Sequence, residues 1–218
     1  IVVDAYANGN VRGFVSNPHV EDVLIRPGKL NVGAVVGTDG TLTVTKDLSM
    51  EENFSGSVEL QSGEIGDDFA YYFTLSEQTP TAVSCGVLIG TDGRVASAGA
   101  MILQMLPDAT ETDISICEHV LEGLKPMSTL IQEYDDSSLE DLANDMFEDA
   151  KILTTQLVAY DCPCSKVRMA RALGTIKKSD VLEMADKEHG CDVTCNFCNE
   201  TYHFTEEELR VIASKMHD

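Results

Sequence analysis

Four cysteines in two closely spaced pairs constrain the fold more than any other feature of the sequence. Cys162 and Cys164 flank one proline in "CPC", and Cys195 and Cys198 flank two residues in "CNFC". Each pair can chelate a metal ion from one loop, and four thiolates are a ligand set of structural zinc. The segment 162–218 is short, and a module of this size often needs such a cross-link. We therefore predict one Zn²⁺ per chain, bound by these four cysteines.

Other ligands and metals are weaker candidates. An iron–sulfur cluster also takes four cysteines, but two pairs separated by 30 residues suit a structural zinc site better. Cys191 is expected to be a bystander, although it could replace a ligand or resolve an oxidised thiol. With four thiolates available, His189 and His203 are expected not to bind the metal.

The paired spacing also permits redox chemistry. Zinc itself is redox-inert, but its thiolate ligands can be oxidised. A disulfide within each pair would remove two ligands at a time, so peroxide would release the metal. The module would then lose the metal-binding energy that stabilises its fold. The alternative is a static zinc site with a purely structural role, which is the usual role of a cysteine tetrad.

Charge and cysteine usage limit the possible partners. The 218 residues carry a formal net charge of −22, which disfavours binding to nucleic acid or to an anionic membrane. The longest apolar stretches are shorter than the roughly 20 residues of a membrane span. Seven cysteines, with tight pairs and without an export signal, favour a cytoplasmic protein over a secreted disulfide framework. Because the chain begins "IVVDAYANGN", we expect a processed or incomplete N-terminus.

The pattern along the chain predicts an α+β fold with a strand-rich N-terminal α/β domain over residues 1–108. The stretches "VRGFVS" and "TLTVTKDL" alternate apolar and polar residues, as half-buried strands do. The sequence "GTDG" occurs at 37–40 and 90–93, and Asp-Gly favours tight hairpin turns. The stretch "DDFAYYFTLSEQTPTA" predicts a helix that ends before Pro80.

Residues 109–161 form the predicted helical, acidic linker. Thr110 and Asp113 make a plausible capping pair for a helix that Gly123 and Pro126 help to end. From Pro126 to Ala150 there are eight acidic residues and no Lys or Arg, so like charges weaken helices there. The segment is either a solvated acidic linker or a segment that folds only when it is docked.

Residues 162–218 form the predicted C-terminal zinc-binding module. The stretch "SKVRMARALG" predicts a helix ending at Gly174, and Ser179 is expected to cap a second helix. The cysteine loop should lead into a short aromatic strand, and Thr205 with Glu208 forms the capping box of a third helix. This module carries eight basic and ten acidic side chains, so nearly all of the negative charge lies upstream.

Two groups of motifs resemble the redox-regulated heat-shock holdases, the thirty-three-kilodalton bacterial heat-shock protein family. The C-terminal motifs are "CPCSKVRMARAL" and "CNFCNETYHFTEEEL". The upstream stretches "VRGFVSNP", "GTLTVTKDL", "SGSVELQSGEIGDDFAYYFTLSEQTPTAV" and "AGAMILQMLPDA" are similar to the family's N-terminal domain. The resemblance covers essentially the whole chain. Family members begin some tens of residues before Ile1, so part of that domain is expected to be missing.

The resemblance implies a molecular chaperone that needs no ATP and is inactive while reduced and zinc-bound. Oxidation of the zinc ligands Cys162, Cys164, Cys195 and Cys198 would then release zinc, unfold the module and destabilise the linker at about 110–160. The oxidised protein would dimerise and hold unfolding client proteins. Without the resemblance, a static zinc-ribbon interaction module and a thiol-disulfide oxidoreductase are the alternatives. No enzyme active site is expected elsewhere in the chain.

Overall fold

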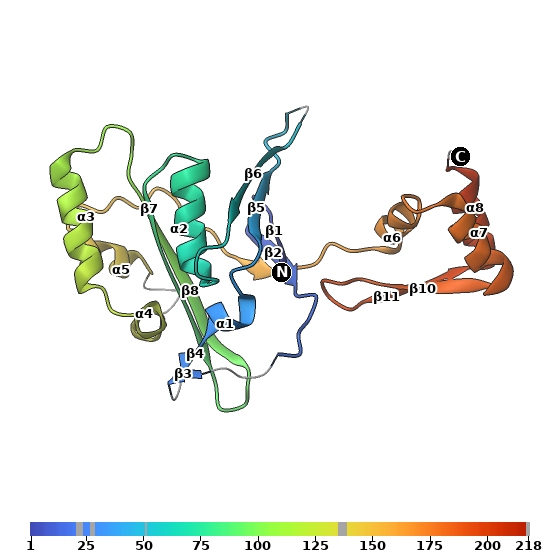
Figure 1. Cartoon of the computed structure of the whole chain (residues 1–218), viewed down its shortest axis with the longest axis horizontal. Coiled ribbons are helices and arrows are strands. Elements are labelled where there is room, and N and C mark those ends of the chain that lie inside the picture. Colours follow the sequence, from blue (N-terminus) through green and yellow to red (C-terminus); the bar gives the residue numbers. More distant parts are fainter. Residues whose placement is uncertain (21–23, 27–28, 51, 135–138, 217–218) are drawn as a thin grey trace. The chain divides into compact units, whose positions relative to one another are not determined.

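The computed structural model describes residues 1–20, 24–26, 29–50, 52–134 and 139–216. These residues form two compact units: unit 1 contains residues 1–19 and 154–218, and unit 2 contains residues 20–153. Helices and several small sheets occur together (Figure 1), in agreement with the predicted mixture of α and β structure. The sequence-based domain boundaries at 108 and 161 remain a prediction.

Unit 2 begins with short elements and a two-stranded sheet. In chain order these are β3 (Leu24–Arg26), β4 (Lys29–Leu30), α1 (Val32–Val36), β5 (Thr41–Lys46) and β6 (Phe54–Glu59). Strands β5 and β6 pair antiparallel, with Leu42 opposite the buried Val58. The first "GTDG" joins helix α1 to strand β5, so the expectation of a hairpin turn at residues 37–40 is wrong.

Helix α2 (Ile65–Ser76) ends before Pro80, as predicted. Its Tyr72 side chain is fully buried. The buried carboxylate of Asp68 accepts the backbone N–H groups of Gln61 at 2.7 Å and Ser62 at 3.2 Å. These bonds fix the chain that leads from β6 into the helix, and they satisfy one of the two buried carboxylate oxygens.

Strands β7 (Thr81–Ile89) and β8 (Val95–Gln104) form a long antiparallel hairpin, and the second "GTDG" makes its turn as predicted. Helix α4 (Met127–Glu133) packs on this hairpin at two glycines that face each other across the strands. A Cβ on Gly86 would lie 2.4 Å from the backbone nitrogen of Ser128, and one on Gly99 would lie 2.4 Å from a methyl group of Ile131. The glycines therefore allow the helix to approach the strands closely.

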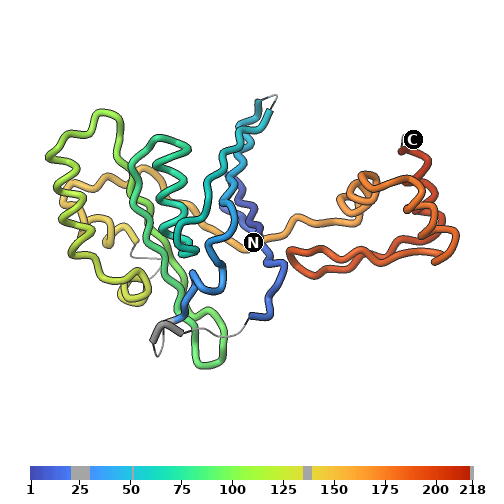
Figure 2. Tube along the Cα trace, in the orientation of Figure 1, coloured from blue at the N-terminus to red at the C-terminus, as the bar shows by residue number. Residues whose placement is uncertain are grey.

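Within the acidic region, the described residues are helical over 111–123, 127–133 and 139–146. Helix α3 (Glu111–Gly123) begins with the predicted capping box of Thr110 and Asp113, and α5 (Leu139–Met146) follows α4. Met127 and Leu130 of α4 are buried, whereas α3 and α5 bury no side chain. Residues 150–158 form neither helix nor strand (Figure 2). In that segment Leu157 is 92% exposed.

Unit 1 starts with strands β1 (Val2–Ala5) and β2 (Asn10–Phe14), which pair antiparallel and are here called the N-terminal hairpin. Strand β2 lies where "VRGFVS" predicts a strand. On its other edge β2 pairs in parallel with β9 (Ala159–Tyr160), which immediately precedes the first cysteine pair. The three-stranded sheet therefore joins residues about 150 positions apart in the chain.

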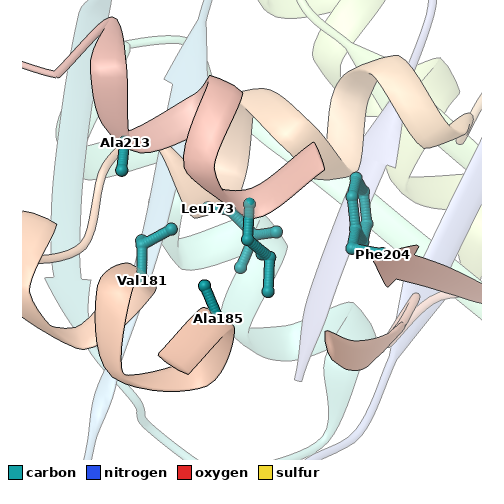
Figure 3. Packing of buried hydrophobic residues seen from close by; sticks show 6 residues of the cluster. Leu173, Val181, Ala185, Phe204 and Ala213 are labelled. Atoms are coloured by element: carbon teal, nitrogen blue, oxygen red, sulfur yellow. The ribbon is translucent and has the colours of Figure 1, made fainter. Parts of the chain in front are cut away.

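The rest of unit 1 is a small helical module with one hairpin. Its elements are α6 (Lys166–Leu173), α7 (Lys178–Lys187), β10 (Gly190–Thr194), β11 (Thr201–Thr205) and α8 (Glu206–Ser214). Figure 3 shows its core, with Leu173, Val181, Ala185, Phe204 and Ala213 labelled. Leu209 belongs to the same buried cluster. With so few buried residues, the module has little apolar burial to stabilise it.

Two local predictions in this module need correction. Helix α7 begins at Lys178 after an extended Lys177, and the Ser179 hydroxyl contacts Asp180 rather than capping the helix. The cysteine loop leads into the aromatic strand β11 as predicted, but it is shorter than expected, because Cys191 to Thr194 already form β10 and pair with β11. The Thr205–Glu208 capping box of α8 and the end of α6 at Gly174 are as predicted.

Candidate metal centre

Two loops position the four cysteines of the predicted site. Cys162 and Cys164 lie between β9 and α6, and the side chain of Ser165 caps α6 directly after them. Cys195 and Cys198 lie in the turn between β10 and β11. In that turn the Cys195 N–H donates to the Glu200 carbonyl and the Asn199 N–H to the Cys195 carbonyl, both at 2.8 Å. The backbone of the second loop is therefore fixed by its own hydrogen bonds.

The four sulfur atoms form one cluster in which all lie within 4.8 Å of one another. The Sγ atoms of Cys162 and Cys195 are 3.7 Å apart, and those of Cys164 and Cys198 are 3.3 Å apart. A tetrahedral zinc site with Zn–S bonds of about 2.3 Å requires sulfur–sulfur distances of about 3.8 Å. The observed separations, from 3.3 Å up to at most 4.8 Å, bracket this value, so the donor set fits a zinc ion in number and element and can close around it with small shifts.

Electrostatics supports the same conclusion. Burial raises the pKa of Cys162, but hydrogen bonds from Arg12 and the backbone of Cys164 outweigh it and lower the pKa to about 7. A backbone hydrogen bond with Glu200 lowers the pKa of Cys198, yet the Cys164 sulfur and loss of solvent raise it to about 12. Clustered thiols cannot all ionise without a counter-charge, and a bound cation supplies that charge.

Two further side chains contact the sulfurs and were not identified from the sequence. The Tyr202 hydroxyl lies within hydrogen-bonding distance of Cys164 Sγ, at 3.2 Å, and this contact raises the pKa of Tyr202 to about 12. Arg12 Nη1 lies 3.7 Å from Cys162 Sγ. Tyr202 follows the second cysteine pair closely in the sequence, and this short separation could have identified it as a neighbour of the metal site. Arg12 lies in a strand pattern that carries no such signal.

The remaining candidates lie outside the cluster. Cys191 is half-buried in β10, where it packs against the module core, and burial raises its pKa. His189 Nδ1 lies 3.1 Å from Glu206 Oε2, and His203 Nδ1 lies 2.8 Å from Asp192 Oδ1. Within the described part of the chain, the group of sulfur, imidazole and carboxylate ligands that could hold a metal contains only the four predicted cysteines.

Comparison with known proteins agrees with the motifs. The family model described as "Hsp33 protein" matches residues 1–205. The chain belongs to the Hsp33 family. A "33 kDa chaperonin" of Shouchella clausii is 44% identical over 214 residues, which cover 97% of this chain and 72% of that protein. A "33 kDa chaperonin" of Bacillus licheniformis is also 44% identical, over 216 residues that cover 99% of this chain and 74% of the relative.

A solved structure shows the same fold. The crystal structure of the 33 kDa chaperonin (Hsp33) from Thermotoga maritima superposes with a TM-score of 0.82 at 33% identity, covering 97% of this chain and 72% of that one. The family is one of chaperones, and the relatives carry the name chaperonin. Among the described residues, no helix has both the length and the apolar character needed to cross a membrane.

Proposed function

We propose that this chain is a redox-regulated holdase, a chaperone that protects unfolding proteins from aggregation without ATP. Reduced and zinc-bound, it would be inactive, and oxidation of Cys162, Cys164, Cys195 and Cys198 with loss of zinc would activate it. The observation that carries the proposal is the cluster of four sulfurs within 4.8 Å, in a chain of the Hsp33 family.

In the reduced state the four cysteines would hold Zn²⁺ through their Sγ atoms. The ion would supply a cross-link between two loops and keep all four sulfurs as thiolates. Structural zinc contributes roughly 10–16 kcal/mol of apparent binding energy in small modules, and this becomes folding energy. Among the described residues of the module, the apolar core contains six buried side chains, so its fold would depend on the metal.

Oxidation by peroxide removes the donors two at a time. Two thiolates lose two electrons and form one disulfide bond, while the O–O bond of hydrogen peroxide breaks and, with two protons, gives two water molecules. We propose disulfides within each pair, Cys162 with Cys164 and Cys195 with Cys198. Two equivalents of peroxide would thus consume all four ligands, and the module would lose its cross-link.

The acidic linker is the segment that we propose to unfold next. Helices α3 and α5 bury no side chain, and Leu153 and Leu157 are 83% and 92% exposed. Short acidic helices with so little burial are marginally stable. Their unfolding would expose further apolar surface, to which unfolding clients would bind and through which two oxidised chains would associate. We place this activity in the cytoplasm, with neither nucleic acid nor membrane as a partner.

The test follows zinc release and client aggregation in the same sample. Reduced, zinc-loaded protein is treated with hydrogen peroxide at mild heat, zinc is measured with a chromogenic chelator, and aggregation of a thermally unfolding client is followed by light scattering. We expect zinc loss and suppression of aggregation to rise together, and to do so equally in a Cys191→Ser variant.

Two other outcomes would contradict the proposal. Zinc that stays bound, with the module folded, would favour a static zinc-ribbon interaction module. Catalytic turnover of a small disulfide by metal-free protein would favour a thiol-disulfide oxidoreductase.

A further inference from the structure

Arg12 of strand β2 reaches the metal centre from the N-terminal hairpin. Its Nη1 lies 3.7 Å from Cys162 Sγ, while Nε and Nη2 donate to Asp4 Oδ2 at 2.9 and 2.7 Å. The side chain is only 13% exposed. A guanidinium removed from water needs charged or aromatic partners on several sides, and here one of these partners is a sulfur of the cluster.

The second cysteine loop provides another partner of Arg12. The guanidinium carbon lies 3.9 Å from the centre of the Phe197 ring, a cation–π contact with the residue immediately before Cys198. Phe14, also in β2, meets the same ring edge-on at a centroid distance of 5.0 Å. Arg12 therefore contacts both loops of the cluster, the first through a sulfur and the second through an aromatic ring.

Backbone contacts join the same three segments. The Asp161 N–H donates to the Val11 carbonyl at 3.0 Å, directly before Cys162. The Tyr160 hydroxyl lies 2.6 Å from the Phe197 carbonyl oxygen and 3.0 Å from that of Gly13. The strand pairing of β2 with β9 thus ends where the first cysteine pair begins.

We propose that Arg12 is a positioning residue of the metal centre, which holds Cys162 Sγ and the Phe197 ring in place and couples metal binding to docking of the N-terminal hairpin. The inference rests on the proposed zinc site in its reduced state. Because equilibrium coupling is reciprocal, a docked hairpin raises the affinity for metal by the same factor by which bound metal favours docking. Release of the metal would then free the hairpin.

The first test measures metal retention in the reduced, full-length chain. The rate of Zn²⁺ transfer to a chelator is compared for wild type, Arg12→Gln, Arg12→Lys and Arg171→Gln. Arg171 is exposed on α6, so its variant makes the same change in net charge away from the sulfurs. We expect Arg12→Gln to lose zinc about 10- to 100-fold faster, as for other contacts that orient metal ligands, and Arg171→Gln to stay within about twofold of wild type.

Arg12→Lys separates charge from position. An ammonium cannot at the same time donate to Asp4, approach Cys162 and lie flat over Phe197. We therefore expect Arg12→Lys to lose zinc at a rate between those of wild type and Arg12→Gln. Cobalt gives a further readout: replacing Zn²⁺ by Co²⁺ should reveal a shifted thiolate-to-metal charge-transfer band in Arg12→Gln and an unshifted band in Arg171→Gln. A wild-type spectrum in Arg12→Gln, or full retention in Arg12→Lys, would overturn the positioning role.

Hydrogen exchange tests the coupling itself. In wild type, removing zinc should accelerate exchange of the Ala159 and Asp161 amides, which donate to the carbonyls of Gly9, directly before strand β2, and of Val11 within it. In Arg12→Gln these amides should exchange rapidly even with zinc bound, while those of α8 stay protected and show that the module is folded. Zinc-independent protection of both amides would overturn the inference alone. A wild-type chain that binds no zinc would overturn both this inference and the proposed function.

Discussion

The Sγ atoms of Cys164 and Cys198 lie 3.3 Å apart although 34 positions separate the two residues. The other close pair, Cys162 and Cys195, also joins one loop to the other. A metal bound here therefore closes a long chain segment that contains α6, α7 and β10. Closing such a segment restricts the unfolded chain, which is why one site can determine the stability of the whole module.

Removing one ligand should therefore affect folding as well as metal affinity. We expect Cys198→Ser to weaken zinc binding by more than the roughly 10- to 100-fold seen for outer contacts, and to lower the helical circular dichroism of the reduced protein. Cys191→Ser is the matched control, because Cys191 packs against the core outside the sulfur cluster. Equal zinc retention in both variants would contradict the assignment of Cys198 as a ligand.

Tyr202 should support the site through its hydroxyl alone. Tyr202→Phe removes the contact of 3.2 Å to Cys164 Sγ and keeps the ring. We expect about tenfold weaker zinc binding in a chelator competition. Tyr71→Phe, an exposed tyrosine of α2, is the control. Unchanged affinity in Tyr202→Phe would show that the hydroxyl does not stabilise the thiolate ligand.

The sequence predicted which four cysteines lie together because the chemistry of a metal site is local in each loop. Spacing within "CPC" and "CNFC" identifies two chelating pairs without any knowledge of the fold. Arg12 could not be found in this way, since it reaches Cys162 only through the pairing of β2 with β9. An arginine in an alternating strand looks the same whether it faces solvent or a sulfur.

The starts of helices α8 and α7 compare a sequence-predicted cap that the structure contains with one that it lacks. Thr205→Ala removes the hydroxyl that accepts the Glu208 N–H in the capping box of α8, and it should cost about 1 kcal/mol of unfolding free energy. Ser179→Ala should cost less than about 0.5 kcal/mol, because Ser179 does not cap α7. Urea unfolding of the reduced, zinc-loaded protein measures both. A larger loss in Ser179→Ala would restore the sequence-based prediction.

The docking of α4 on the β7–β8 hairpin depends on Gly86. A methyl group there would lie 2.4 Å from the Ser128 nitrogen, so Gly86→Ala should displace α4 and cost about 1–3 kcal/mol. Faster exchange of the α4 amides and partial holdase activity in the reduced state should follow. Gly123→Ala, where a Cβ meets nothing within 4 Å, is the control and should be nearly neutral. Unchanged α4 protection in Gly86→Ala would contradict this packing.

Sequence patterns also predicted most helices, but they did not predict which elements these helices contact. The capping pair Thr110 and Asp113 predicts where α3 begins, because both partners are neighbours in the chain. The facing glycines Gly86 and Gly99 are 13 residues apart in the sequence. Their role in packing α4 arises only when β7 pairs with β8 and α4 lies on both strands. Contacts made by tertiary packing therefore needed the structure.

Asp113 should give α3 an acid-dependent stability. Hydrogen bonds from the hydroxyl and the backbone N–H of Thr110, both at 2.7 Å, lower the pKa of Asp113 below its ordinary value of 3.8. Because the folded-state pKa is the lower one, the stabilisation is complete above the unfolded value and is lost as pH falls through the folded value. Titration of the Asp113 carboxyl by NMR should show this low pKa, and Thr110→Ala should move it part of the way back. In wild type, protection of the α3 amides, after correction for intrinsic exchange, should fall as the pH is lowered from about 5 to 3. In Asp113→Asn, this fall of protection with pH should be absent. An unshifted Asp113 in wild type would contradict the capping box.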